Sequence, residues 1–148
     1  MASLIPKFTT TQIAALSTSS IASLHTDDWA SFDTAQIAAL TTIQIPAIET
    51  VDFRVLSTAN IAALDSNQVA VMSSAQVAAM TTTQAGVLNS TQVAAFTTDA
   101  ISAMTTASLR VLTTDSTAAL TTSMVQALSS NQVVALSTSQ VADRKSVV

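Results

Sequence analysis

A large apolar residue recurs at every eighth position along almost the whole chain. The series starts at Phe8, ends at Leu136 and makes 17 consecutive octads without an insertion or a deletion. Self-similarity at a fixed period is typical of repeat proteins, in which stacked units bury a continuous core. Any fold of this chain must therefore repeat one structural unit per octad.

With the large apolar residue as position one, the consensus octad is Leu-Thr-Thr-x-Gln-Ile-Ala-Ala. Position two is Ser, Thr, Asp or Asn in 15 of the 17 octads, and the exceptions are His25 and Glu49. Position three is Ser or Thr in all 17, and position five is Gln in 9. Position six is apolar in every octad except the one that holds Thr117. The octad thus combines two apolar positions with a hydroxyl-rich segment between them.

Two helix-start signals coincide in this octad. Ser or Thr at position two followed by Gln at position five forms a capping box, in which position two is the N-cap and position five is N3. The apolar residues at positions one and six then occupy N′ and N4, where they form a hydrophobic staple. The pattern predicts a helix that starts at position three, continues for five or six residues and ends near the next large apolar residue. The following N-cap then redirects the chain, since an N-cap residue is not helical.

Other regular structures fit the octad less well. A single long helix would rotate the apolar residues by about 80° per octad and distribute them over all faces. A coiled coil needs a repeat near 3.5 or 3.67 residues, and eight is a multiple of neither. A β-solenoid stays open as the alternative, because Thr, Ile and Val favour strands. We therefore predict an all-α solenoid with one short capped helix per octad, with a β-solenoid as the alternative.

The octad also predicts which positions face the core. Positions one, six and eight are expected inside, whereas position seven, which holds Arg54, is expected nearer the surface. The number of octads per superhelical turn is not readable from the sequence; the one feature that points toward two is the valine at position eight in every second octad, at Val55, Val71 and Val87. Pro46 at position seven should distort or shorten its helix, because proline removes a backbone donor.

Composition excludes several functional classes. The net charge is −4, and the 5 Lys and Arg residues do not cluster before Arg144-Lys145, which argues against nucleic acid as a partner. The chain has no cysteine and no apolar run long enough to form a membrane-spanning helix. Its N-terminus lacks the pattern of a signal peptide. We expect one repeat domain over residues 1–143, followed by a polar tail at 144–148.

The segment His25-Thr26-Asp27-Asp28-Trp29 is the richest polar cluster and the strongest candidate for a metal or acid–base site. It also fits the octad frame as an ordinary helix start. His25 is then the N-cap, Asp27 and Asp28 are first-turn acids that stabilise the helix dipole, and Trp29 fills position six. The chain has no further histidine and no glycine-rich phosphate loop. We therefore predict no catalytic, cofactor-binding or metal-binding residues and no enzymatic activity.

The unit seen at Phe8–Ser17 and Leu88–Thr97 resembles the Thr-Thr-x-Gln-Ile-Ala-Ala-Leu arrays of large repetitive bacterial proteins. Some of these proteins look like secreted, calcium-binding or adhesin-type polypeptides, so the resemblance implies a secreted or cell-surface setting. The glycine- and aspartate-rich nonapeptides of calcium-binding secreted proteins are absent here, and calcium binding is not implied.

These observations favour a non-enzymatic structural or interaction module, such as a spacer, scaffold or adhesin segment with a protein or glycan surface as its partner. The alternative is a ligand-binding array that uses a face of Thr and Gln side chains to bind ice or glycan. The array begins without a polar capping unit, which favours end-to-end self-association through its ends.

Overall fold

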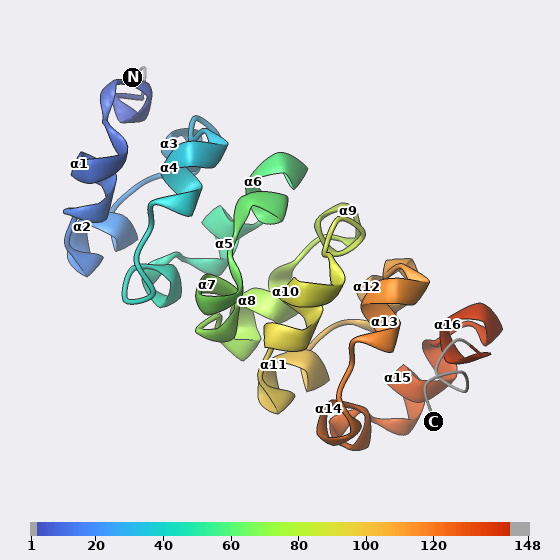
Figure 1. Cartoon of the computed structure of the whole chain (residues 1–148). Coiled ribbons are helices and arrows are strands. Elements are labelled where there is room, and N and C mark those ends of the chain that lie inside the picture. The colour runs from blue at the N-terminus through green and yellow to red at the C-terminus, as the bar shows by residue number, and fades with distance from the viewer. Residues whose placement is uncertain (1–2, 143–148) are drawn as a thin grey trace.

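A computed structural model describes residues 3–142 and shows an all-α arrangement (Figure 1). Within these residues there are sixteen α-helices of four to six residues, two short 3-10 helices and no strand. The predicted all-α repeat of very short helices is confirmed, and the β-solenoid alternative is wrong for this part of the chain. The end of the predicted array at residue 143 and the tail at 144–148 lie outside the described residues.

The elements follow one another at intervals of about one octad. In chain order they are η1 (Ile5–Lys7), α1 (Thr10–Ala14), α2 (Thr18–Ala22), α3 (Thr26–Trp29), α4 (Thr34–Ala38), η2 (Ile45–Ala47), α5 (Thr50–Phe53), α6 (Thr58–Ala63), α7 (Ser66–Ala70), α8 (Ser74–Ala79), α9 (Thr82–Ala85), α10 (Ser90–Ala95), α11 (Thr98–Ser102), α12 (Thr106–Val111), α13 (Thr114–Ala118), α14 (Thr122–Ala127), α15 (Ser130–Ala135) and α16 (Thr138–Ala142).

Every α-helix starts at position three of its octad, as predicted, and α8 shows why. Its N-cap Ser73 has an extended backbone, with φ −73° and ψ 154°. The amide N–H of Gln76 donates to Ser73 Oγ at 3.2 Å, and the amide N–H of Ser73 donates to Gln76 Oε1 at 2.9 Å. These reciprocal bonds are the capping box, and they satisfy two backbone donors that a helix start leaves unpaired.

The link between helices needs no glycine. At the end of α8 the C-cap Met80 has φ −55° and ψ 135°, and the next N-cap, Thr81, has φ −73° and ψ 158°. Two successive extended residues thus redirect the chain before α9 begins. None of the described residues has a positive φ, and the chain's one glycine, Gly86, has φ −66°. The apolar–hydroxyl step itself is therefore the connection, as the sequence predicts.

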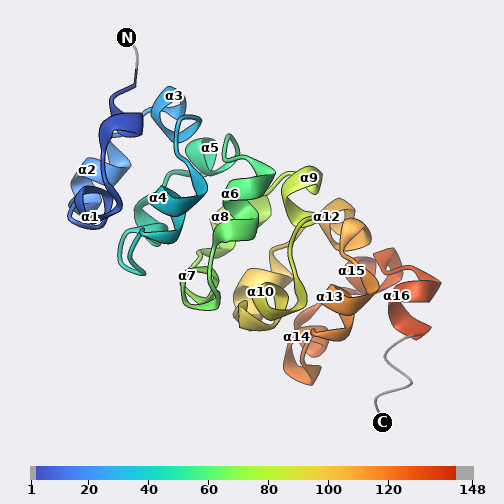
Figure 2. The same ribbon diagram turned by 45° about the horizontal axis from the view of Figure 1, so that its top comes forward.

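The helices wind into an elongated superhelix with the first and last described turns at opposite ends (Figure 1, Figure 2). Each helix packs against the third helical element along the chain, as α7 does with α10 and α8 does with α11. Glutamine side chains reach back 28 and 31 residues to the preceding turn, for example from Gln68 to Leu40 and Ile37. With one octad for each helical element, these spacings place between three and four octads in each turn. The sequence left this number open, and the recurrence of valine in every second octad does not correspond to it.

The core lies along the superhelix axis and is lined by positions one and six. Position six is fully buried in most octads, for example at Ile37 and Ile61, and position one is buried from Phe32 to Leu128. Position seven is mostly exposed, as predicted. Position eight is mostly half-buried, so its predicted place inside the core is only partly right. Val71 and Val87 pack against the core, whereas Val55 is exposed.

Pro46 shortens its helix as expected. Its octad has only the 3-10 helix η2. In the turn just before η2, the amides of Gln44 and Ile45 both donate to the carbonyl oxygen of Thr41. The proline nitrogen has no hydrogen to continue this series. The octad nevertheless keeps its frame, because Gln44 still makes both bonds of the capping box with Thr41.

Candidate functional site

Position five is the most distinctive site of the octad, because its glutamine is buried and uses both ends of its amide. Gln68 is 2 % exposed. Its Oε1 accepts from the amide of Asp65 at 2.9 Å, which completes the cap of α7. Its Nε2 donates to the carbonyl oxygens of Leu40 at 2.7 Å and Ile37 at 2.9 Å, which belong to the preceding superhelical turn. One side chain therefore caps its own helix and ties it to the turn before.

The same donation recurs along the superhelix, and we call this series the glutamine ladder. Each rung runs to the position-one carbonyl one turn earlier, and in all but one case also to the position-six carbonyl that precedes it. The exception is Gln132, which takes the carbonyls of Met104 and Ser102. The members are Gln36, Gln44, Gln68, Gln76, Gln84, Gln92, Gln132 and Gln140.

Shorter donors at position five also reach the preceding turn. Asn60 Nδ2 donates to the carbonyl oxygen of Phe32 at 3.1 Å, and Ser116 Oγ donates to that of Leu88 at 2.7 Å. Both acceptors are position-one carbonyls 28 residues earlier. A side chain shorter than glutamine can therefore form the rung, although the buried Ser108 accepts from the N-cap hydroxyl of its own helix and makes no bond to the preceding turn within the described residues.

The two octads with unusual N-caps lie next to each other in space. His25 and Glu49 are three octads apart along the chain, and their helices α3 and α5 pack together. Between them is an open hollow of ≈ 470 Å³ lined by residues that include both N-caps and Asp52. The sequence presents these exceptions as separate irregularities, whereas the fold collects them into one acidic region.

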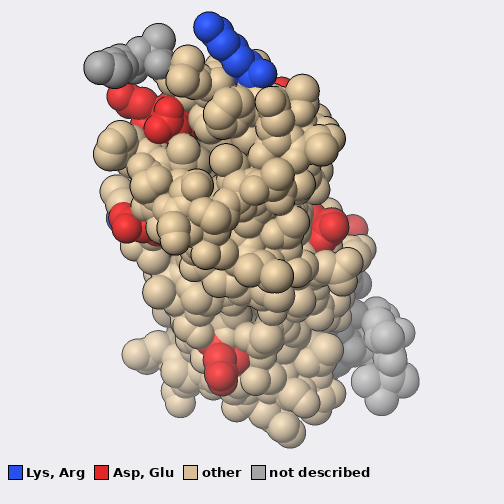
Figure 3. Space-filling view, turned by 90° about the vertical axis from the view of Figure 1, so that its left-hand side faces the viewer, with Lys and Arg blue, Asp and Glu red and all other residues tan. Residues whose placement is uncertain are grey.

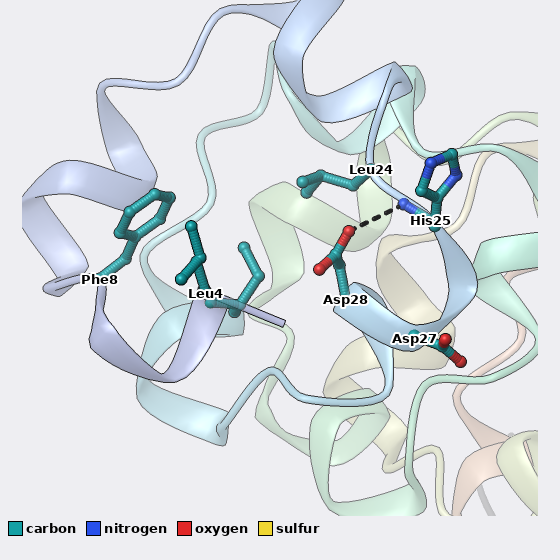
Figure 4. A pocket seen from close by; sticks show the side chains of 7 residues that line it. Leu4, Phe8, Leu24, His25, Asp27 and Asp28 are labelled. Carbon is teal, nitrogen blue, oxygen red and sulfur yellow. Dashed lines mark hydrogen bonds between the residues drawn. The ribbon is translucent and has the colours of Figure 1, made fainter. Parts of the chain in front are cut away.

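The His25–Trp29 segment is an ordinary helix start, as the octad frame predicts. His25 is the N-cap of α3, and its amide donates to Asp28 Oδ2 at 3.1 Å. The hydroxyl of Ser3 and this amide lower the pKa of Asp28. Around a hollow of ≈ 340 Å³, the side chains of His25, Asp27 and Asp28 point in different directions (Figure 4).

Metal coordination has no geometric support in residues 3–142. No three His, Cys, Asp or Glu side chains there lie close enough to hold a metal ion. The charged side chains visible in Figure 3 are small separate patches on a largely uncharged face. None of the described helices is long and apolar enough to cross a membrane.

Trp29 occupies position six and is completely buried, as predicted. Its ring stacks on that of Phe32, with centroids 4.6 Å apart and planes inclined by 14°. Its Nε1 is buried without a hydrogen-bond partner among the described residues. An unpaired buried donor costs free energy, so the apolar contacts of the ring must offset it.

The ladder is the feature that sequence reasoning missed. The capping box explains the recurrence of glutamine and accounts for only its Oε1, so the two hydrogens of Nε2 had no predicted acceptor. A buried amide must satisfy its donors as well as its acceptor. The two hydrogens of Nε2 that the capping box leaves without an acceptor therefore indicate a second partner. They do not indicate where in the chain that partner lies.

The fold and its ladder define an all-α repeat protein, a superhelix in which short capped helices recur with the octapeptide repeat. Residues 5–42 and 45–82, together just over half of the chain, match the ALTTAQ repeat family, and the chain belongs to this family. No curated protein and no solved structure matches it.

Proposed function

We propose that this chain is a non-enzymatic spacer or scaffold module, of the kind that its resemblance to large repetitive bacterial proteins implies. The observation that carries the proposal is the glutamine ladder. Its rungs join successive turns along the superhelix axis through buried side chains such as Gln68, Gln76 and Gln84. The most characteristic polar residue of the repeat thus holds the rod together and is not available to an external ligand.

Small-angle X-ray scattering tests this proposal on the whole chain and on a variant in which residues 8–143 are duplicated in the octad frame. A stiff spacer gains length in proportion to its octads, so the duplicated chain should have about twice the maximum dimension. A compact particle, or a flexible chain whose size grows with roughly the square root of its length, would contradict the proposal.

A ligand-binding array is the second candidate, and exposed hydroxyls favour it. Thr97 and Thr98, at positions two and three, are exposed, as are the equivalent residues of most octads. The glutamines cannot contribute to such a face, because from Gln36 onward they are buried in the ladder. Thermal hysteresis and glycan-array binding test this function, and a negative result in both would remove it.

We also propose end-to-end association with a second copy through the first described turn. Phe8, Leu16 and Leu24 are only half-buried there, whereas position one is buried from Phe32 to Leu128. Gln12 is exposed, and its Nε2 has no hydrogen bond among the described residues. Light scattering should show mass rising with protein concentration, and a constant monomer mass would contradict the association.

A further inference from the structure

One buried position of the ladder holds a carboxyl group in place of a donor. Asp52 is at position five of the octad that begins at Ile48, and it is 3 % exposed. Its side chain makes no hydrogen bond within the described residues, neither to the N-cap of its own helix nor to the preceding turn. By contrast, the buried amides at position five of the other described octads, such as Asn60 and Gln68, all donate to the preceding turn.

The ladder register places a backbone acceptor opposite this carboxyl group. One rung back from Asp52, in the register that joins Asn60 to Phe32, is Leu24, and α3, which follows Leu24, packs against α5. The carbonyl oxygen of Leu24 has no hydrogen bond within the described residues, although the equivalent oxygens of Leu40, Ile48 and Leu56 each accept from a glutamine. Leu24 and Asp52 line the same hollow, and neither acceptor has a donor among the described residues at the place where the register puts a rung.

Asn60 shows what the missing donor would accomplish. Asparagine has the same shape as aspartate, and Asn60 Nδ2 reaches the carbonyl oxygen of Phe32 at 3.1 Å in this register. A side chain of this length therefore spans the gap when it carries a hydrogen. A protonated Asp52 has such a hydrogen, and an ionised one does not.

We propose that Asp52 forms a proton-dependent rung of the ladder: its protonated carboxyl group donates to the carbonyl oxygen of Leu24, and ionisation breaks this link between α3 and α5. The proton is the donor that fits the site. Asp52 is only 3 % exposed, toward the open hollow between α3 and α5, and the described residues contain no set of side chains that could hold a metal ion.

The surroundings of Asp52 favour the protonated form. Burial is the largest cause of its raised pKa, and the negative charge of Glu49 at the N-cap of the same helix adds to it. From α3, Asp28 raises the pKa further and His25 lowers it, whereas Asp27 is exposed. Helix α8, the other helix packed on α5, has no titratable side chain, and Arg54 at the end of α5 is exposed at position seven.

The sign of the pH effect follows from the raised pKa. The folded state holds this proton more tightly than the unfolded state, so the rung stabilises the fold at acid pH. Its contribution is complete below the ordinary value of 3.8 and is lost as the pH rises through the folded pKa of Asp52. Each pKa unit of separation changes the folded-to-unfolded ratio about tenfold.

Three variants of the full chain test the proposal by urea unfolding between pH 4 and pH 8. Asp52→Asn supplies the donor permanently, so it should be more stable than the wild type at pH 7, and the difference should vanish toward pH 4. Asn60→Asp should acquire the pH dependence that Asp52→Asn removes. Asp99→Asn, at an exposed first-turn position of α11, is the matched control and should keep the wild-type pH profile.

Two local measurements complete the test. The carboxyl carbon of Asp52 should titrate above 3.8 in NMR spectra. The fluorescence of Trp29, which is buried in α3, should report a pH-dependent change in the wild type that Asp52→Asn lacks. A titration midpoint at or below 3.8, or a stability gain from Asp52→Asn that is independent of pH, overturns the proposal. So does salt-dependent recovery of stability at pH 7 without protonation, because a bound cation would then hold the ionised group.

Discussion

The glutamine of the octad makes two kinds of hydrogen bond with one amide group. In Gln68, Oε1 belongs to the cap of α7, and Nε2 belongs to the ladder. Gln12 makes the same capping bonds with Thr9 but has no described turn before it. Substitutions of Gln12 therefore test helix capping alone, whereas substitutions of Gln68 test capping and the bonds to the preceding turn together.

Replacing Gln68 with Glu should be far more costly than replacing Gln12 with Glu. Glutamate at N3 retains the capping bond, so Gln12→Glu should change the free energy of unfolding by less than about 0.5 kcal/mol. Gln68→Glu removes both ladder donors and places a carboxylate against two carbonyl oxygens, which should cost about 2 to 4 kcal/mol at pH 7. Urea unfolding measures both values, and equal losses would show that the capping bond alone matters.

Replacing Trp29 should remove an unpaired buried donor, whereas replacing Gln68 removes donors that are paired. Trp29→Phe removes the unpartnered Nε1 together with part of the ring, so the two effects oppose each other. We expect a net change within about 1 kcal/mol, smaller than the roughly 3 to 5 kcal/mol typical of removing a buried aromatic ring. Thermal unfolding checks this, with Phe53→Ala in the same region as the reference for a full loss of ring packing.

The helices are too short to be stable alone. Each described helix has four to six residues. Such a helix has too few backbone hydrogen bonds to offset the cost of nucleation in water. Most of them therefore depend on an N-cap side chain for a defined start, and all depend on their neighbours for persistence. The extended residues that separate the helices, such as Met80 and Thr81, prevent them from merging into one long helix.

Removing one N-cap hydroxyl should weaken the fold by a predictable amount. Ser73 Oγ accepts from the amide of Gln76, whereas the next residue, Ser74, has an exposed side chain at the first helical position. Ser73→Ala should cost about 1 kcal/mol, and Ser74→Ala should have little effect. If both variants lost the same stability in urea unfolding, the loss would come from the exposed hydroxyl in general and not from the cap.

The whole molecule is held together by a rule about spacing along the chain. Every rung joins a position-five donor to carbonyls of the preceding turn at nearly constant separation, and most octads have such a donor at position five. Deleting a whole octad preserves this rule, since each later glutamine still meets position-one and position-six carbonyls. Deleting half an octad violates it for every pair that spans the deletion.

Deletion of residues 64–71 should therefore give a folded chain that is shorter by one octad, with lower stability than the wild type. Deletion of residues 66–69 removes less of the chain but shifts Gln76, Gln84 and Gln92 out of register with their carbonyls, so it should unfold or separate the parts on either side. Far-UV circular dichroism and thermal unfolding compare the two variants. A half-octad deletion as stable as the whole-octad deletion would show that the ladder does not set the register.

The sequence by itself determined where each helix begins and ends. A helix start depends on neighbours within the first turn, and Ser73 and Gln76 make both hydrogen bonds of the capping box between them. The same local reasoning placed position six in the core and Pro46 in a shortened helix. It also placed Trp29 and the surrounding acids in an ordinary helix start.

Only the tertiary structure decided how the octads wind. The sequence left the number of octads per turn open and placed position eight in the core. The fold has between three and four octads in a turn, buries position eight only in part and buries position five. The partners of Gln68 Nε2 lie 28 and 31 residues away, and no local pattern specifies that distance. The angle between successive helices results from packing around a common axis, so the glutamine ladder and the exceptional position of Asp52 in it become visible only when the turns are stacked.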